Sequence, residues 1–374
     1  MRRTRALAAA LGGNAGIAFV RAPGRVNLIG DHTDYNDGFV LPVAIDRECV
    51  VAWRARAGDT VRVHSLDLDD VVTVPADGTC EPTAIAPEWG RLVAGVIAAL
   101  AQRGRPAVAF DCALTSAVPI GSGLSSSAAF EVALALAALD AAGAPPFERR
   151  EVARACRDAE QAATGVPCGL MDQLASLFGE RDHALLIDCR ELAIQPVGLP
   201  ARVAVLVVHS GVSRALADSA FAERRVECER AATRLGVRTL RDVTLADVGD
   251  EPRARHVVSE NQRVLGAVAA LESGDLDTLG RLLGESHASL RDDFEVSTPE
   301  LDLLVELLVE EGAIGARLTG AGFGGCVVAL TRRNRADHVA ARTVQRYRAA
   351  TGLDPHAVVG RAVDGAGPLA PEDA

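Results

Sequence analysis

The sequence predicts an α+β fold in two lobes. The chain has 374 residues, which is long for a single hydrophobic core. Its first eighty residues are rich in strand-like segments, whereas helical patterns dominate from about residue 213. We therefore expect an N-terminal lobe over residues 1–180 and a C-terminal lobe over residues 181–374, each built from mixed or antiparallel sheets and helices.

The N-terminal lobe is expected to begin with a short helix and to continue mainly as strands. Turn residues separate four strand-like segments, over residues 20–30, 39–57, 59–68 and 71–76. A helix and a further strand are predicted next, over residues 87–104 and 107–119. The segment 121–143 opens with a glycine–serine loop and is then apolar on almost every side, which predicts a helix buried between layers. Two more helices are predicted over residues 148–165 and 168–179.

The C-terminal lobe is expected to contain more helix than strand. Two strands come first, over residues 183–190 and 202–211. Helical patterns follow over residues 213–236, 253–274, 275–294 and 298–312. A strand, a glycine turn and a second strand then fill residues 314–333, before a last helix and a strand over residues 356–363.

The composition excludes several classes of function. A formal net charge of −11 argues against a nucleic-acid binder or a protein bound to anionic membranes. No apolar run approaches the ~20 residues that a membrane-spanning helix needs. The N-terminal MRRTRALAAALGG has only a short apolar part, so we interpret it as the opening helix of a cytoplasmic protein and not as a signal peptide. We expect a monomer or a weak oligomer.

The cysteine and histidine patterns and the absence of lysine exclude further kinds of site. The eight cysteines are scattered without a CxxC pair, so free thiols in a reducing compartment are expected. The eight histidines show no metal-binding spacing such as HExxH, so no zinc site is expected. All 39 basic residues are arginine. The absence of lysine excludes a Walker A loop, the ATP-binding lysine of protein kinases and Schiff-base chemistry.

Three segments contain the residues that suggest a ligand. The first is VPIGSGLSSSAAFEVA, residues 118–133. Its glycines allow the backbone to bend closely around a ligand, and its serines stand where a helix begins. Unpaired N–H groups and the helix dipole favour an anion such as phosphate at that point. A simple N-cap after a glycine turn explains the same residues equally well.

The other two segments are DAEQAATGVPCGLMDQ, residues 158–173, and LTGAGFGGCVVAL, residues 318–330. In the former, Glu160 lies on a helix and Asp172 follows the turn that ends it, among apolar neighbours. A buried carboxylate needs a partner, a metal or a catalytic task, although an N-cap or a solvated aspartate is the simpler interpretation here. The glycine-rich segment fits a close approach to a ligand better than a plain hairpin.

The order and wording of these segments resemble the GHMP small-molecule kinases, and within them the galactokinases. That family opens with a signature close to GRVNLIGEHTDYNDGFVLP, and residues 24–42 of this chain read GRVNLIGDHTDYNDGFVLP. PIGSGLSSSAA, CGLMDQ and LTGAGFGGC also match, so that the resemblance covers nearly the whole chain. It implies a two-lobed GHMP-kinase fold with the active site in the cleft between the lobes. It also implies phosphoryl transfer from Mg-ATP to the anomeric hydroxyl of D-galactose.

The resemblance assigns roles to individual residues. Asp172 matches the catalytic base, and Arg25 matches the arginine that stabilises the transferred phosphoryl group. Ser127 and Glu160 match the Mg²⁺ ligands. The sugar-binding positions correspond to Asp31, His32, Thr33, Asp34, Gly169 and Phe221. The ATP-binding positions correspond to Ser65 and to the loop residues Gly121, Ser122, Gly123, Leu124, Ser125, Ser126 and Ser127.

Two of these residues depart from the family pattern. Asp31 stands where the signature has Glu, and Phe221 stands where a tyrosine is usual. A lost hydrogen bond to a substrate hydroxyl can change specificity substantially. A kinase of a related aldose is therefore an alternative to a galactokinase. A non-catalytic sugar sensor on the same fold is a further alternative, but SSSAA, Arg25 and Asp172 weigh against it.

Overall fold

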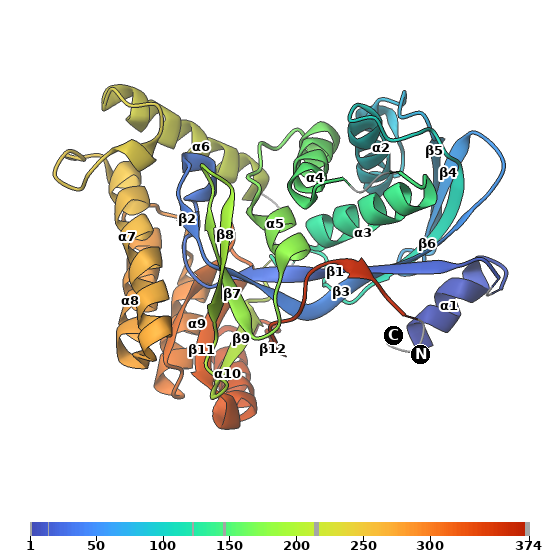
Figure 1. Cartoon of the computed structure of the whole chain (residues 1–374). Coiled ribbons are helices and arrows are strands. Elements are labelled where there is room, and N and C mark those ends of the chain that lie inside the picture. The colour runs from blue at the N-terminus through green and yellow to red at the C-terminus, as the bar shows by residue number, and fades with distance from the viewer. Residues whose placement is uncertain (1, 14, 122, 145–146, 213–216, 371–374) are drawn as a thin grey trace.

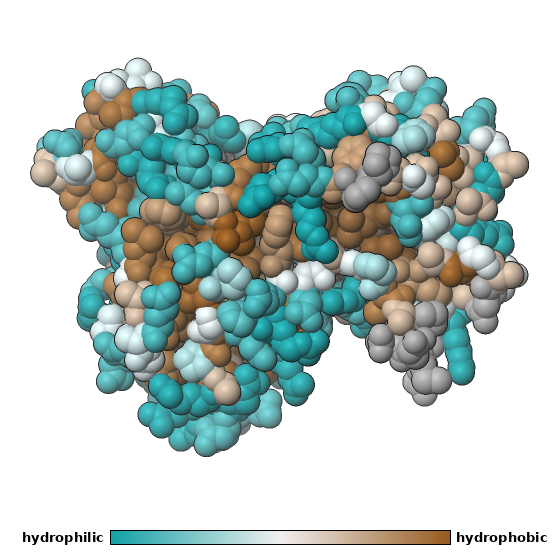
Figure 2. Space-filling view, viewed as in Figure 1, coloured by the Kyte–Doolittle hydropathy of each residue, from teal (hydrophilic) through white to brown (hydrophobic). Residues whose placement is uncertain are grey.

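Two long neighbouring strands, β1 (Ala18–Asn27) and β3 (Pro42–Ala55), run through the middle of the molecule and connect its two halves (Figure 1). The structure is a computed structural model that describes residues 2–13, 15–121, 123–144, 147–212 and 217–370. In the space-filling view, the two halves stand apart along the upper edge of the molecule (Figure 2).

The first half is built on a six-stranded sheet among the described residues, in the order β13-β1-β3-β6-β4-β5. The neighbouring pairs are antiparallel except β4 and β6, which are parallel, so the sheet is mixed. The remaining strands are β4 (Thr60–Ser65), β5 (Asp70–Pro75), β6 (Phe110–Ser116) and β13 (Gly367–Pro368). The strands predicted up to residue 119 are therefore confirmed, with somewhat different bounds.

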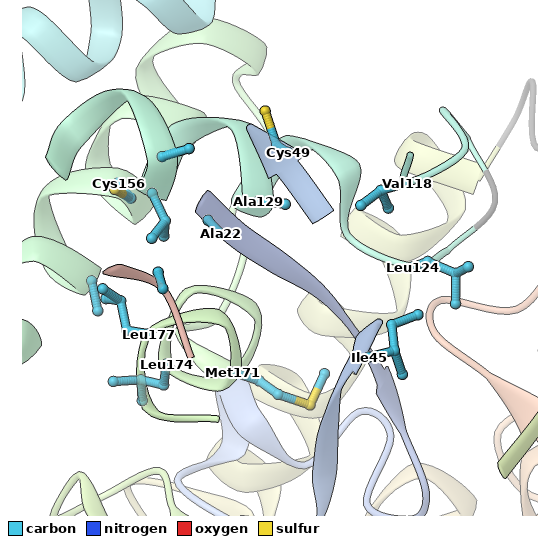
Figure 3. Packing of buried hydrophobic residues seen from close by; sticks show 14 of the residues in the cluster. Ala22, Ile45, Cys49, Val118, Leu124, Ala129, Cys156, Met171, Leu174 and Leu177 are labelled. Atoms are coloured by element: carbon cyan, nitrogen blue, oxygen red, sulfur yellow. The ribbon is translucent and has the colours of Figure 1, made fainter. Parts of the chain in front are cut away.

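Helices cover both faces of this sheet. Successive side chains of β3 point to opposite faces, and those on each face are apolar. Val51 belongs to the cluster shared with the central helix, α3 (Ser126–Ala141), whereas Val50 and Ala52 pack against α1 (Arg2–Ala10). On its outer side α3 contacts three more helices, α2 (Trp89–Ala101), α4 (Arg149–Thr164) and α5 (Met171–Phe178). Figure 3 shows Ala129 of α3 in the same hydrophobic cluster as Cys156 of α4 and Leu174 of α5. The all-round apolar sequence of α3 thus corresponds to a helix between two layers, as predicted.

The second half contains a four-stranded antiparallel sheet in the order β10-β11-β9-β12. Its strands are β9 (Val203–His209), β10 (Gly315–Thr319), β11 (Cys326–Arg332) and β12 (His356–Gly360). Its helices are α6 (Ala217–Arg234), α7 (Pro252–Ser273), α8 (Leu276–Asp292), α9 (Pro299–Glu310) and α10 (Ala336–Thr351). These elements follow the predicted order, and residues 213–216 of the first predicted helix lie outside the described residues.

The two halves are tied together by strands that are distant in sequence. A small antiparallel sheet joins β2 (Phe39–Val40) to β7 (His183–Asp188) and β8 (Ala193–Gly198), the last of which has no counterpart among the predicted strands. The C-terminal β13 pairs with β1. The boundary at residues 180 and 181 stays a prediction, and any division has to place β13 with the first sheet. No helix in the described part of the chain is long and apolar enough to cross a membrane.

Candidate active site

A cavity of about 1110 Å³ lies between the two halves and gathers most of the predicted site residues. Its walls come from β1 and the segment after it, the glycine–serine loop, α4, α5, α6 and the glycine loop after β10. Predicted residues that line it are Arg25, Asp31, His32, Asp34, Gly121, Gly123, Ser125, Ser126, Ser127, Glu160, Gly169, Asp172 and Phe221. The three sequence segments singled out above therefore meet in one place.

Arg25 and Asp172 form a two-pronged ion pair inside this cavity. Arg25 Nε donates to Asp172 Oδ1 at 2.7 Å, and Nη2 donates to Oδ2 at 2.5 Å. The third donor, Nη1, reaches the main-chain oxygen of Gly123 at 2.6 Å. Both residues line the cavity, and the aspartate side chain, at 27 % exposed, is the more accessible of the two, since the arginine is 8 % exposed. Paired donors of this kind fix a carboxylate in both position and orientation.

The glycine–serine loop lies directly beside this pair. Gly121 and Gly123 have φ values of 72° and 77°, in the left-handed region that glycine adopts most readily. Ser125, at φ 57°, precedes the first residue of α3 and donates its hydroxyl to Asp172 Oδ2. The N-terminal N–H groups of α3 therefore open towards the cavity close to Asp172, where an anionic group is favoured.

A second group of carboxyls lies deeper, between α3, α4 and α5. Ser127 Oγ donates to Glu160 Oε1 at 2.7 Å, and Gln173 Nε2 donates to Glu160 Oε2 at 2.9 Å. The same amide nitrogen lies 3.3 Å from Oε2 of Glu131, which is fully buried. Burial raises the pKa of Glu160 above its ordinary value. A hydroxyl and a carboxylate side by side at a cavity wall are suitable ligands for Mg²⁺.

Glu131→Gln is expected to stabilise the metal-free protein at alkaline pH. Burial first, and then the charge of Glu160, raise the pKa of Glu131 well above 4.5. The folded state therefore favours the neutral acid, and wild-type stability falls as the pH rises above 4.5 towards the raised value. An amide keeps the neutral form and can donate to Gln173 Oε1. We expect a higher melting temperature for Glu131→Gln at pH 8 in EDTA, by on the order of 2 °C, and little difference at pH 4.5.

Calorimetry or dye-monitored melting at the two pH values tests this expectation. A variant that melts below wild type at pH 8 would show that Glu131 is needed as a carboxylate.

The opposite end of the cavity is formed by the segment after β1. A Cβ atom at position 169 would lie 1.8 Å from Asp34 Oδ2, so the turn before α5 can approach this carboxylate only as glycine. Burial, and then the charge of Asp172, raise the pKa of Asp34 to about 6. His32 Nδ1 lies 2.8 Å from the hydroxyl of Tyr35, and burial lowers the pKa of this histidine to about 3. Phe221 packs beside it, with ring centroids 5.7 Å apart.

Two of the residues assigned to the sugar, Thr33 and Asp31, have side chains that are hydrogen-bonded within the protein. Thr33 is fully buried, and its hydroxyl lies 2.7 Å from the main-chain oxygen of Gly30 and 2.6 Å from that of Phe39, so it closes a turn away from the cavity. Asp31 lines the cavity, but its carboxylate accepts from Arg317 and from the main-chain N–H of Gly320. The negative charge of this residue is therefore already paired within the protein.

Two predicted nucleotide residues also lie elsewhere. Ser65 ends β4, is buried, and accepts from the N–H of Leu68 at 3.3 Å, and it does not line the cavity. The side chain of Leu124 is buried in the core, although its main-chain oxygen accepts from the N–H of Arg25 at 3.0 Å. Ser122 lies outside the described residues.

Sequence reasoning missed four residues that belong to this region. Gln173 and Glu131 connect to Glu160, Arg317 pairs with Asp31, and Glu260 on α7 accepts from the N–H of Gly30 at 3.0 Å. The sequence carries a signal for one of them, because Arg317 is an arginine inside the apolar strand segment IGARLTG. The other contacts depend on which elements pack together.

Known families and proteins match this chain over nearly its whole length. Residues 8–55 match the galactokinase galactose-binding signature, residues 91–180 the N-terminal domain of GHMP kinases, and residues 267–349 their C-terminal domain. A galactokinase from Roseiflexus sp. (strain RS-1) is 48 % identical over 368 residues, which cover 93 % of this chain and 92 % of that protein.

Solved structures agree with these matches. The crystal structure of Lactococcus lactis galactokinase complexed with galactose has a TM-score of 0.90 and 32 % identity, covering 98 % of both chains. Methanococcus jannaschii mevalonate kinase has a TM-score of 0.69 at 18 % identity, covering 94 % of this chain and 100 % of that one, and shares the fold. The α+β GHMP-kinase fold is therefore confirmed, and the chain belongs to the galactokinase family of the GHMP kinases, which are phosphotransferases with a hydroxyl acceptor.

Proposed function

We propose that this protein transfers the γ-phosphoryl group of ATP to the anomeric hydroxyl of D-galactose and forms galactose 1-phosphate. The observation that carries the proposal is the Arg25–Asp172 pair, which lies between the glycine–serine loop and the segment after β1 in one cavity. A phosphate donor at the loop and a sugar at the other wall would meet at this pair. The 48 % identical galactokinase and the galactose complex of the Lactococcus enzyme support the choice of sugar.

Asp172 is the base in this proposal. Its carboxylate faces the cavity, and hydrogen bonds from Arg25 and Ser125 hold it in place. A carboxylate so oriented accepts the proton of the sugar hydroxyl as that oxygen attacks phosphorus. Arg25 holds the carboxylate and places positive charge beside the transferred group, where negative charge spreads over the phosphoryl oxygens.

The loop and the first turn of α3 hold the nucleotide phosphates through main-chain N–H groups, which explains how a chain without lysine can bind ATP. Ser127 and Glu160 would hold Mg²⁺, since their oxygens lie together at the cavity wall and are hard ligands. When bound, Mg²⁺ neutralises charge on the phosphate oxygens. Described His, Cys, Asp and Glu side chains form no group of three or more that could hold a metal, so phosphates would complete this site.

At the other wall, Asp34 and His32 are the side chains that we assign to the sugar hydroxyls, with Gly169 giving Asp34 its room. We also propose that the enzyme works in the cytoplasm, as a monomer or weak oligomer.

One observation favours the alternative of a related aldose. The carboxylate of Asp31 is already paired, and Phe221 presents a ring without a hydroxyl at the cavity wall. A panel of aldoses with purified protein and Mg-ATP separates the two functions, with product mass and phosphorylated position as the readout. We expect galactose to have the highest kcat/KM of the panel, and Phe221→Tyr to leave its use unchanged or to improve it. Far faster turnover of another sugar would overturn the assignment of galactose.

A further inference from the structure

Arg317 on β10 is among the largest side chains that are fully buried in the described residues. Its Nη2 donates to Asp31 Oδ2 at 2.5 Å, and its Nη1 donates to the main-chain oxygen of Leu28 at 3.1 Å. Side-chain exposure is 0 % for the arginine and 3 % for the aspartate. Two charges buried this deeply are tolerated only because they form an ion pair. Removing one of them leaves the other buried without a counter-charge.

The second oxygen of Asp31 extends this contact to the glycine loop. Oδ1 accepts from the main-chain N–H of Gly320 at 3.1 Å, at the point where β10 ends. Thr319 Oγ1 donates to the main-chain oxygen of Asn27 at 2.9 Å in the same layer. The segment after β1 and the loop after β10, which are distant in sequence, are thus joined through one carboxylate.

Both joined segments line the cavity. Asp31 and His32 form one part of the wall, and Gly320 and Ala321 form the part next to them. The main chain of Asp31 is held from a third side by His256 Nε2 on α7, at 3.1 Å. The glycine–serine loop is held separately, through the contacts of Arg25 with Gly123.

We propose that Arg317 is a positioning residue for sugar binding, which acts through Asp31 to set the spacing between His32 and the Gly320–Ala321 wall. Arg317 is fully buried and does not line the cavity, so it acts on the ligand only through its partner. Because the pair lies at the sugar end, its loss alters sugar affinity and leaves the nucleotide end in place. This inference rests on the proposed function for the identity of the sugar.

The test compares wild type with Arg317→Met. Galactose binding is measured by calorimetry without nucleotide, and the KM values for galactose and ATP are measured separately. The change removes the charge-assisted bonds to Asp31 and leaves that carboxylate with the Gly320 N–H. We expect the Kd and KM for galactose to rise by about 10-fold or more, with the KM for ATP unchanged.

Arg105→Met is the matched control. Arg105 is also buried, and it donates to the main-chain oxygens of Ala138, Ala76 and Val108, away from the cavity. We expect this variant to melt at a lower temperature, as Arg317→Met does, but to keep both KM values. A folded Arg317→Met with wild-type galactose affinity would overturn the proposal. Failure of wild type itself to phosphorylate galactose would instead overturn the proposed function.

Hydrogen exchange on the unmodified protein decides the matter if Arg317→Met does not fold. The probe is galactose without nucleotide. If Asp31 connects the segment after β1 to the loop after β10, galactose should slow amide exchange in residues 28–34 and in residues 318–322 together. Slowing confined to residues 28–34 would contradict the proposal.

Discussion

Asp172→Ala is expected to lower kcat for galactose phosphorylation by at least about 10³-fold, which is within the range of general-base contributions. The carboxylate of Asp172 is accessible from the cavity, between the glycine–serine loop and the part of the wall that we assign to the sugar. Without it, the sugar hydroxyl keeps its proton as it attacks. Nucleotide binding should persist, because the main-chain groups of the loop and the side chains of Ser127 and Glu160 are unchanged. Steady-state kinetics and calorimetry with an ATP analogue separate these two effects.

The control for this variant is Asp188→Ala. Asp188 also forms an ion pair with an arginine, Arg241, at 3.1 Å, but it lies outside the cavity. Its loss should leave kcat near the wild-type value. Asp172→Asn adds a second comparison, since it keeps the size of the side chain and lacks the basic oxygen. A fast Asp172→Ala or Asp172→Asn enzyme would rule out Asp172 as the base.

Arg25→Met is expected to lower kcat by about 10³-fold through a different cause. The guanidinium makes three hydrogen bonds, to both oxygens of Asp172 and to Gly123 O. Methionine keeps much of the length and none of the donors, so both the position of Asp172 and the positive charge beside the phosphoryl group are lost. Lysine restores the charge without the fork geometry, and we expect Arg25→Lys to recover only part of the rate.

Arg21→Met provides the control on the same strand. Arg21 also forms an ion pair, with Glu48 at 3.4 Å, and it does not line the cavity. We expect its kinetics to resemble wild type. Equal losses for Arg21→Met and Arg25→Met would mean that the effect comes from weakening β1 and not from the site.

Much of the fold and site could be predicted from the sequence because the signals are local. The period of residues 121–143 indicates a helix apolar on all sides, and α3 is indeed enclosed between β strands and helices. The family signatures bring Arg25 and Asp172 into one site, and the structure pairs them directly. Two of the assigned residues, Thr33 and Ser65, do not line the cavity. Thr33 and Ser65 are buried polar residues whose hydroxyls satisfy nearby main-chain groups.

What could not be predicted depends on contacts between distant segments. Nothing next to Asp31 in sequence indicates that its charge meets Arg317, which is 286 residues away. The strand β13 likewise pairs with β1 only because the chain returns to the first sheet. Gln173 is adjacent to Asp172 in sequence, but its link to Glu131 and Glu160 requires α3, α4 and α5 to pack together. Such pairings come from tertiary packing, which local patterns do not encode.

Identification of the product of one reaction tests the proposed function most directly. Purified wild type and Asp172→Ala are each incubated with Mg-ATP and galactose, and the phosphorus of the product is followed by NMR. We predict that wild type forms a sugar phosphate coupled to the anomeric proton, while Asp172→Ala forms none on the same timescale. Phosphate on another sugar carbon, or the same product at the same rate from Asp172→Ala, would contradict the account.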